Sequence, residues 1–306
     1  MNFLSYLISG ISLGSVYALI ALGYTMVYGI AKMLNFAHGD VIMIGGFVIF
    51  TAVSSMHTSA GVAIVCAIIV CTVLGVTIEK IAYKPLRNAP PLAVLITAIG
   101  VSYFLQNMAL LIFGSASRNF PDILNLPDWH VAEGLTVTGE AILTIAATIV
   151  IMIALTAFIN HTRIGSAMQA VSEDRGAAQL MGVNVNSTIS VTFAIGSALA
   201  AVASLLLCSS YPLIGPYTGA MPGIKAFVAA VFGGIGSIPG AMIGGILSLC
   251  GVLIGAFFGI LLGAIENLSK AYISSTLSDA IVFGVLIIVL LVKPTGILGK
   301  TMREKV

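Results

Sequence analysis

Residues Gly223–Gly245 read GIKAFVAAVFGGIGSIPGAMIGG, and this run lies in a long apolar stretch that carries almost no charge. Lys225 is the only charged residue between Arg175 and Glu266. A glycine-rich loop in a soluble protein often cradles a phosphate, but here no Gly-Lys-Ser/Thr sequence follows and no strand pattern precedes it. In lipid, small residues instead let helix backbones approach closely. The run therefore predicts a packed membrane-protein core.

Two rows of small residues at four-residue spacing support this interpretation. The first row is Gly236, Gly240, Gly244 and Ser248, and the second is Gly251, Gly255, Gly259 and Gly263. Residues four apart lie on the same face of a helix. We expect the first three glycines, Gly236, Gly240 and Gly244, to face another helix at close backbone approach.

The composition of the whole chain agrees with a membrane protein. Hydrophobic residues make up 59% of the 306 residues, and charged residues only 8%, against about 25% in soluble proteins. The net charge of +2 gives no reason to expect a nucleic-acid partner. The four cysteines lie in apolar stretches without the spacing of metal ligands, so we expect neither a disulfide framework nor a metal site.

Apolar segments long enough to cross a bilayer occur throughout the chain, since such a helix needs about 20 mostly apolar residues. Candidate spans are roughly 4–30, 37–56, 60–82, 91–115, 139–159, 188–211 and 276–292. The segment of about 225–263 is too long for one span and is interrupted at Gly236–Gly240, giving two short spans or a broken helix with a re-entrant piece. The prediction is an all-α polytopic membrane protein of eight or nine spans, with one transmembrane domain over residues 1–306.

The positive-inside rule orients these spans. The nine-span count places ten of the thirteen Lys and Arg residues on one side, which should be the cytoplasm. These ten are Lys32, Lys80, Lys84, Arg87, Arg163, Arg175, Lys293, Lys300, Arg303 and Lys305. The N-terminus would then lie outside and the C-terminus inside, whereas an eight-span count would move one terminus.

Two loops are long enough to contact a partner. The outer loop, about 116–138, contains Asp122, Asp128 and Trp129, whose charges and ring could dock a protein. Alternatively, the tryptophan sits in the aromatic belt at the membrane interface. The inner loop, about 160–187, could form short amphipathic helices that dock on a cytosolic partner, or a solvated connector. Its expected apolar face is Ile164, Met168, Val171, Ala178 and Met181, and its expected exposed charges are Glu173, Asp174 and Arg175.

Four polar residues are candidates for the translocation pathway or its gate. Asn35, His38 and Asp40 precede or begin the second predicted span. As structural roles, Asn35 suits a helix N-cap and an acidic residue suits the positive end of the helix dipole. The functional alternative is a polar lining, because an ionisable side chain at mid-membrane costs about 2.5–3.5 kcal/mol. Lys225 either reaches the outer headgroups or faces the outer mouth of the pathway. No catalytic constellation is present, which disfavours an enzyme.

Several stretches resemble the membrane permeases of branched-chain amino acid ABC importers, of the LivH type. They are Leu7–Asp40 (LISGISLGSVYALIALGYTMVYGIAKMLNFAHGD), Glu79–Arg87 (EKIAYKPLR), Ala98–Gly100, Phe104–Asn107, Arg163–Asn184, Gly223–Gly245 and Pro294–Gly299. The resemblance extends over essentially the whole chain. It implies an importer permease fold in the bacterial inner membrane that carries branched-chain amino acids, while close relatives carry urea or short amides.

The resemblance also implies partners. These would be a second permease of LivM type, two cytosolic ABC ATPases and a periplasmic amino-acid-binding protein. The inner loop would touch an ATPase, through residues that include Arg163, Gly165, Glu173, Asp174, Arg175 and Gly182. The chain has no Walker A loop and needs no cofactor of its own, because ATP would be bound by the partner subunits. An ion-coupled secondary transporter remains the alternative, since broken helices would suit that class as well.

Overall fold

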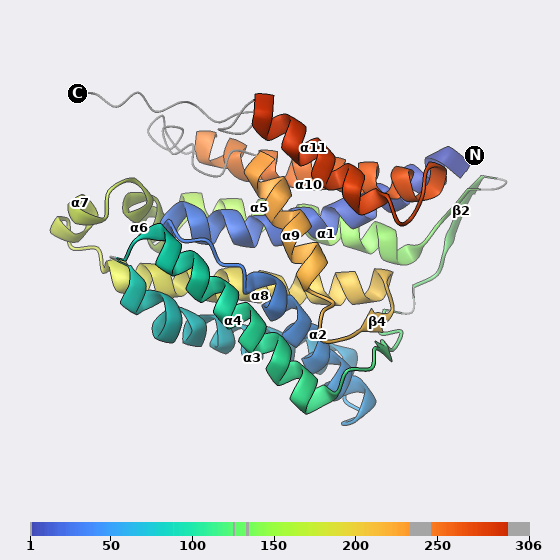
Figure 1. The fold of residues 1–306 in the computed structure, drawn as a ribbon, viewed down its shortest axis with the longest axis horizontal. Coiled ribbons are helices and arrows are strands. Elements are labelled where there is room, and N and C mark those ends of the chain that lie inside the picture. Colours follow the sequence, from blue (N-terminus) through green and yellow to red (C-terminus); the bar gives the residue numbers. More distant parts are fainter. Residues whose placement is uncertain (1, 88, 125, 133–134, 233–245, 293–306) are drawn as a thin grey trace.

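The structure is a computed structural model that describes residues 2–87, 89–124, 126–132, 135–232 and 246–292. It is a bundle of helices with a few very short strands (Figure 1). The helices are α1 (Asn2–Ala31), α2 (His38–Ser54), α3 (Ala60–Ile78), α4 (Pro91–Phe113), α5 (Gly139–His161), α6 (Arg163–Glu173), α7 (Arg175–Leu180), α8 (Val185–Ser210), α9 (Ala220–Phe232), α10 (Ile246–Tyr272) and α11 (Ser278–Val292). A π-helical turn, η1 (Glu79–Tyr83), and a 3₁₀ turn, η2 (Lys84–Leu86), extend α3.

Five of the described helices are long and apolar enough to cross a membrane, which agrees with an all-helical membrane protein. They are α1, α3 with its extension to Leu86, α4, α5 and α8. The predicted spans at 37–56 and 276–292 appear as α2 and α11, which have 17 and 15 residues and are shorter than the usual span of about 20. The predicted segment 225–263 is divided between α9 and α10. Its expected break, with Gly236, Gly240 and Gly244, lies outside the described residues.

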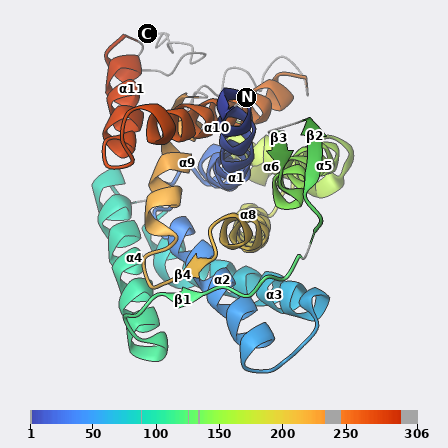
Figure 2. The same cartoon turned by 90° about the vertical axis from the view of Figure 1, so that its right-hand side faces the viewer.

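The central helices are α1 and α8, which Figure 2 shows surrounded by the others. In the most apolar stretch of each helix, 56% of α1 and 72% of α8 is buried, whereas 22% is buried in α4 and in α5. The outward faces of α3, α4 and α5 expose large apolar side chains such as Ile69, Leu111 and Val150. Such faces are stable in lipid, so the burial pattern fits a bundle whose outer helices contact the bilayer.

Glycines allow a close contact between α1 and α10. A Cβ on Gly14 would lie 2.5 Å from the Ile260 Cα, and one on Gly259 would lie 2.6 Å from the Ala18 backbone nitrogen. Gly263 in turn lies directly against the backbone of Gly14. Two members of the second glycine row predicted from the sequence, Gly259 and Gly263, therefore do pack backbone to backbone against α1.

The four strands were not predicted from the sequence. They are β1 (Arg118–Asn119), β2 (Trp129–Ala132), β3 (Leu135–Val137) and β4 (Leu213–Ile214). β2 pairs with β3 as a hairpin, and β1 pairs antiparallel with β4, which follows α8. Strands of two to four residues are too short to produce a recognisable alternation.

The two ends of the bundle carry different structures. Figure 1 shows α6 and α7 at one end, which we call the α7 end, and the N-terminus, β2 and β4 toward the other, which we call the hairpin end. The two long loops predicted from the sequence therefore lie at opposite ends of the bundle.

Candidate functional sites

The predicted inner loop folds into two short helices with well-defined caps. The Thr162 side chain accepts a hydrogen bond from the Gly165 backbone N–H at 3.0 Å, at the start of α6. The Asp174 carboxylate accepts hydrogen bonds from the N–H groups of Gly176 and Ala177, at 2.7 and 3.0 Å, at the start of α7. Gly182 follows α7 with φ +85°, a left-handed conformation that glycine adopts without strain. The loop is therefore a folded unit and not a solvated connector.

The apolar face of this unit is only partly as predicted. Met168, Val171 and Ala178 are buried, which confirms three of the five expected positions. Ile164 and Met181 are 46% and 85% exposed, so these two predictions are wrong. Met181 lies beyond the last residue of α7, where the helical spacing no longer applies. Ile164 lies in the first turn of α6, where neighbouring elements cover its side chain only in part.

The charged tip of the loop also differs from the prediction. Glu173 and Asp174 are exposed as expected. Arg175 does not face water: it is half-buried, and its guanidinium donates a hydrogen bond to the Ala31 carbonyl at the end of α1. Because α1 leaves four carbonyls without partners inside the helix, this bond caps α1 and ties α7 to it.

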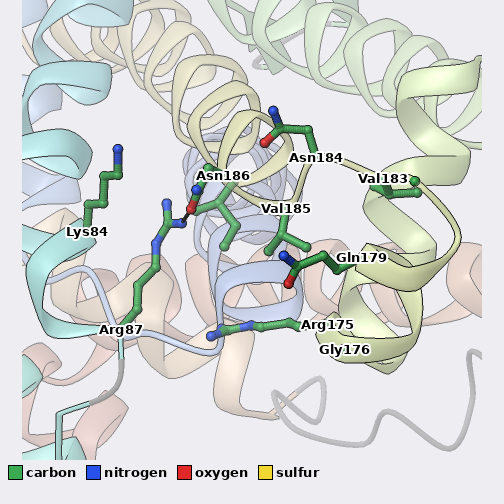
Figure 3. Close-up of a pocket in the computed structure, with 11 residues that line it drawn as sticks. Lys84, Arg87, Arg175, Gly176, Gln179, Val183, Asn184, Val185 and Asn186 are labelled. Carbon is green, nitrogen blue, oxygen red and sulfur yellow. Dashed lines mark hydrogen bonds between the residues drawn. The ribbon is translucent and has the colours of Figure 1, made fainter.

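A groove of about 740 Å³ opens at the α7 end, between η2, α7 and the start of α8. Figure 3 shows Lys84 and Arg87 on one wall, while Arg175 extends toward them from the other. The Arg87 guanidinium donates to the Asn186 side chain and forms an ion pair with Glu79. Glu79 also accepts a hydrogen bond from Ser190 at 2.6 Å.

Glu79 is therefore paired within the chain. The carboxylate is fully buried, and both of its oxygens have partners in this chain. Arg87 in the groove is thus fixed by α3 on one side and α8 on the other.

The 35–40 segment is buried between helices. Asn35 is not the N-cap of α2, because the helix begins at His38 and its N-cap residue has no side-chain bond; the Asn35 side chain instead accepts a hydrogen bond from the Tyr83 hydroxyl at 3.0 Å. Asp40 does lie in the first turn of α2, and it accepts a hydrogen bond from Gln106 of α4 at 2.9 Å.

His38 packs against Gly23 and Tyr24 of α1. Its ring centroid is 4.8 Å from that of Tyr24, edge to face, and its Nε2 is buried without a hydrogen-bond partner among the residues that the structure describes. A side chain on Gly23 would collide with this imidazole. The histidine thus fills a space that the glycine leaves, and the cluster joins α1, α2 and α4.

Lys225 forms the centre of a buried charge network. It is 4% exposed, and its Nζ lies 2.7 Å from a carboxylate oxygen of Glu266 and 2.7 Å from one of Asp279. Glu266 also binds Lys270 at 2.6 Å and the Tyr17 hydroxyl at 2.9 Å. Of the two roles expected for Lys225, the one that reaches the lipid headgroups is therefore wrong, because the buried Glu266 and the partly exposed Asp279 hold its ammonium group.

The acidic members of this network were not predicted from the sequence. A signal existed: Lys225 and Glu266 stand nearly alone in apolar sequence and have opposite charges. Isolated charges in apolar segments usually pair inside a bundle. The pairing itself needed the fold, because it depends on α9 packing against α10 and α11.

The outer loop residues are placed at the hairpin end. Trp129 begins β2 opposite Val137 and is 63% exposed. The Asp128 carboxylate accepts a long hydrogen bond, 3.4 Å, from the Gly139 N–H at the start of α5. Asp122 lies between β1 and β2. The indole is thus presented to the surroundings by a hairpin attached to α5.

Comparison with known proteins gives a consistent result. Residues 6–291 match the family described as branched-chain amino acid transport system, permease component. The chain is 46% identical over 319 residues to the high-affinity branched-chain amino acid transport system permease protein LivH of Salmonella typhimurium, covering all of this chain and 98% of that protein. It is 43% identical over 318 residues to the corresponding permease protein BraD of Pseudomonas aeruginosa, with the same coverage. A solved structure, PsaBC from Streptococcus pneumoniae in complex with Fab, gives a TM-score of 0.48 at 14% identity over 96% of this chain and 93% of that one.

Proposed function

Since the chain belongs to the family of branched-chain amino acid transport system permease components, we propose that it is the membrane-spanning subunit of an ABC importer that carries leucine, isoleucine or valine across the bacterial inner membrane. It is a transport permease subunit and not an enzyme. The observation that carries the substrate proposal is the full-length identity of 46% to a permease of that transport system.

We propose that the single domain, residues 1–306, crosses the membrane nine times, with the N-terminus outside. The nine helices would be α1 to α5 and α8 to α11, with α9 as one half of the interrupted segment. Two contacts support this arrangement. The rings of Phe3 and Tyr6 pack on Tyr272 at the end of α10, at 6.4 and 6.0 Å between centroids, so the start of α1 and the end of α10 lie together.

The α6–α7 unit is the proposed contact with one of two cytosolic ATPases, while a second related permease completes the membrane part. A capped pair of helices at the end of a bundle can transmit force, because its own hydrogen bonds keep its shape. Leu180, next to the tip, is 90% exposed and offers an apolar anchor. Arg163, Gly165, Glu173, Asp174, Arg175 and Gly182 belong to this unit or its ends.

Charge reversal at Glu173 tests the contact with the ATPase. The exposed carboxylate makes no capping bond, so Glu173→Lys should leave the α6–α7 fold intact and uncouple ATP hydrolysis from uptake in proteoliposomes that contain the whole complex. Reversal of Asp174 is a poorer test, because it would also remove the α7 cap. Lys80→Glu, an exposed charge reversal on η1, is the matched control. Normal uptake per ATP hydrolysed in Glu173→Lys would refute the contact.

The ion-coupled alternative is tested in the same proteoliposomes. A permease driven only by partner ATPases takes up nothing when they are omitted, whatever gradient is imposed. Uptake that persists without the ATPases and follows an ion gradient would replace the importer proposal with a secondary transporter.

We propose that the outer loop contacts the periplasmic binding protein. The exposed Trp129 and the neighbouring acidic groups Asp122 and Asp128 offer an aromatic anchor and charge complementarity. Neutralising both aspartates should raise the binding-protein concentration needed for half-maximal uptake. The shift should shrink at high salt, since exposed charges are screened beyond about 8–10 Å. An unchanged concentration dependence at low salt would remove the loop from the docking surface.

A further inference from the structure

Two cavities adjoin at the α7 end, and they differ in chemistry. The groove of about 740 Å³ is lined by cations and amides. The second cavity, of about 380 Å³, lies between the end of α1 and the start of α4. Its walls are mostly apolar: Tyr28, Ala31, Met33, Leu34, Leu86, Pro91, Val94 and Leu95. Arg87 and Arg175 line both cavities, so a charged part and an apolar part adjoin at these two side chains.

The charged part contains more positive than negative charge. Lys32, Lys84, Arg87 and Arg175 line the two cavities, whereas no carboxylate lines either of them. Within the part of the chain that the structure describes, Glu79 is the one carboxylate in an ion pair with any of the four, and it is paired with Arg87. Three cations are therefore left for an anion.

The cations also act on one another. Partial burial, and then the charge of Arg175, lower the pKa of Lys32 to about 8. Burial, and then the charge of Arg87, lower the pKa of Arg175 below its usual value. An anion between these side chains would remove the repulsion, because it favours the charged form of each base.

The backbone at Lys32 is a further sign that its side chain is needed. Lys32 ends α1 with φ +53°, a left-handed conformation in which glycine is the usual residue at a helix end. A non-glycine residue held there costs free energy, and such outliers are concentrated at functional sites. The strain fits a side chain retained for the charge that it brings to the cavities.

We propose that the two cavities bind an anionic phospholipid of the cytoplasmic leaflet. The phosphate lies among Lys32, Lys84 and Arg175, and part of one acyl chain occupies the apolar slot between α1 and α4. Basic pockets between membrane helices on the cytoplasmic side suit anionic headgroups. An acidic side chain of an ATPase would satisfy the cations but would leave the apolar slot unfilled, so an amphiphilic anion fits both parts better.

Lipid binding by the purified complex tests this site. Native mass spectrometry of the delipidated complex, titrated with phosphatidylglycerol, phosphatidylcholine or inorganic phosphate, measures the ligand and its source. We expect phosphatidylglycerol to bind most tightly. Lys32→Gln with Lys84→Gln should weaken it about 25-fold, since each basic residue near an anionic headgroup contributes about a factor of five. These two lysines make no ion pair in the described residues, so the double variant should fold.

Two further variants make the test specific. Lys80→Gln removes an exposed cation that lines neither cavity, and should leave phosphatidylglycerol affinity unchanged. Leu95→Trp should fill the slot and weaken phosphatidylglycerol while leaving inorganic phosphate binding as it was.

Three results would overturn the proposal. The first is equal affinity for phosphatidylglycerol and phosphatidylcholine, or no loss in the double lysine variant. The second is inorganic phosphate that binds as tightly as the lipid, which would mean a simple anion site. The third is a lipid that binds the permease subunits without the ATPases but does not bind the whole complex, which would assign the groove to an acidic side chain of the partner. None of these results depends on which amino acid is transported.

Discussion

Two lysines share one carboxylate oxygen in the Lys225 network, and their surroundings differ. The side chain of Lys225 is 6% exposed and that of Lys270 is 33% exposed, yet both bind Oε1 of Glu266, at 2.7 and 2.6 Å. A buried ion pair gains little over apolar packing, but removal of one member leaves a buried charge without compensation. The network therefore allows the effect of burial on an ion pair to be measured by comparing Lys225 with Lys270, which bind the same carboxylate.

Lys225→Met should destabilise the permease more than Lys270→Met. Glu266 keeps Lys270 and Tyr17 when Lys225 is lost, so the cost should lie below the about 3–5 kcal/mol of an uncompensated buried charge. Loss of the partly exposed Lys270 should cost at most about 1 kcal/mol. Denaturant midpoints of the purified protein in micelles measure both. Equal midpoints for the two variants would mean that water reaches Lys225 and that the lysine faces a hydrated pathway.

Asp40 is the second residue for which the structure predicts a specific effect of substitution. Its bond from Gln106 joins α2 to α4, so Asp40→Asn should weaken that junction and lower the uptake rate. Because the residue acts between helices, the order of preference among competing amino acids should stay the same. Gln106→Leu should lower the rate further, because it removes the bond that Asp40→Asn only weakens. Competition uptake assays check both variants, and a changed order of preference would place Asp40 in a selectivity site.

At the scale of single residues, the sequence predicted which residues have a role better than it predicted which residues they bind. That charges within apolar sequence matter was foreseeable, and Asp40 does lie in the first turn of α2. The partners were not foreseeable: Asn35 binds Tyr83, 48 residues away, and Lys225 binds Glu266, 41 residues away. Such bonds depend on which helices are neighbours, and a local pattern does not carry that information.

Among the elements, α1 and α10 form a close pair. Their contact needs glycine at Gly10 and Gly14 on one helix and at Gly259 and Gly263 on the other, because a Cβ at any of these would meet backbone atoms of the partner helix. The helices can then approach with extensive van der Waals contact, which drives association in lipid.

Gly263→Ala should prevent this approach. The added methyl would overlap the Gly14 backbone, which cannot move away without shifting the whole of α1. We expect a loss of at least 2 kcal/mol, at the upper part of the usual range for overpacking of about 1–3 kcal/mol, and less assembled complex in membranes. Gly100→Ala is the control, since its Cβ would meet no atom within 4 Å and alanine favours the helix. Equal amounts of complex in both variants would contradict the contact.

The sequence predicted the long helices and the use of glycine between them, because apolar length and four-residue spacing are local signals. The prediction for Gly236, Gly240 and Gly244 stays a prediction. The π-turn at Glu79–Tyr83 and the pairing of β1 with β4 were not foreseen. Both involve partners distant in sequence: Glu79 accepts a hydrogen bond from Ser190, 111 residues away, and Arg118 of β1 pairs with Ile214 of β4.

For the whole molecule, the number of spans decides which residues face each side of the membrane. Single cysteines at Phe3, Trp129, Glu173 and Leu277, all exposed positions, can be labelled with a membrane-impermeant maleimide. Nine spans place the first, second and fourth outside, and Glu173 inside. Leu277, between α10 and α11, separates the two counts: if α9 only re-enters the membrane, the residue moves to the inside.

Labelling in cells with a permeabilised outer membrane shows directly on which side of the inner membrane each cysteine lies. The unmodified chain is the control, because its described cysteines Cys66, Cys71 and Cys208 lie within α3 and α8 and should react slowly. Labelling of Leu277→Cys only after the inner membrane is opened would refute nine spans.

The pairing of α1 with α10 has a consequence for biosynthesis. The Tyr17 hydroxyl binds Glu266, 249 residues later in the chain. At about 5–20 residues per second, translation needs roughly 12–50 s to span that distance. During this interval the glycine face of α1 lies in the bilayer without α10 against it. If the ribosome stalls before α10 is made, α1 stays in this unpaired state. Quality-control proteases of the membrane would meet such chains as helices with unpaired polar groups, so the last third of the message decides whether the first helix survives.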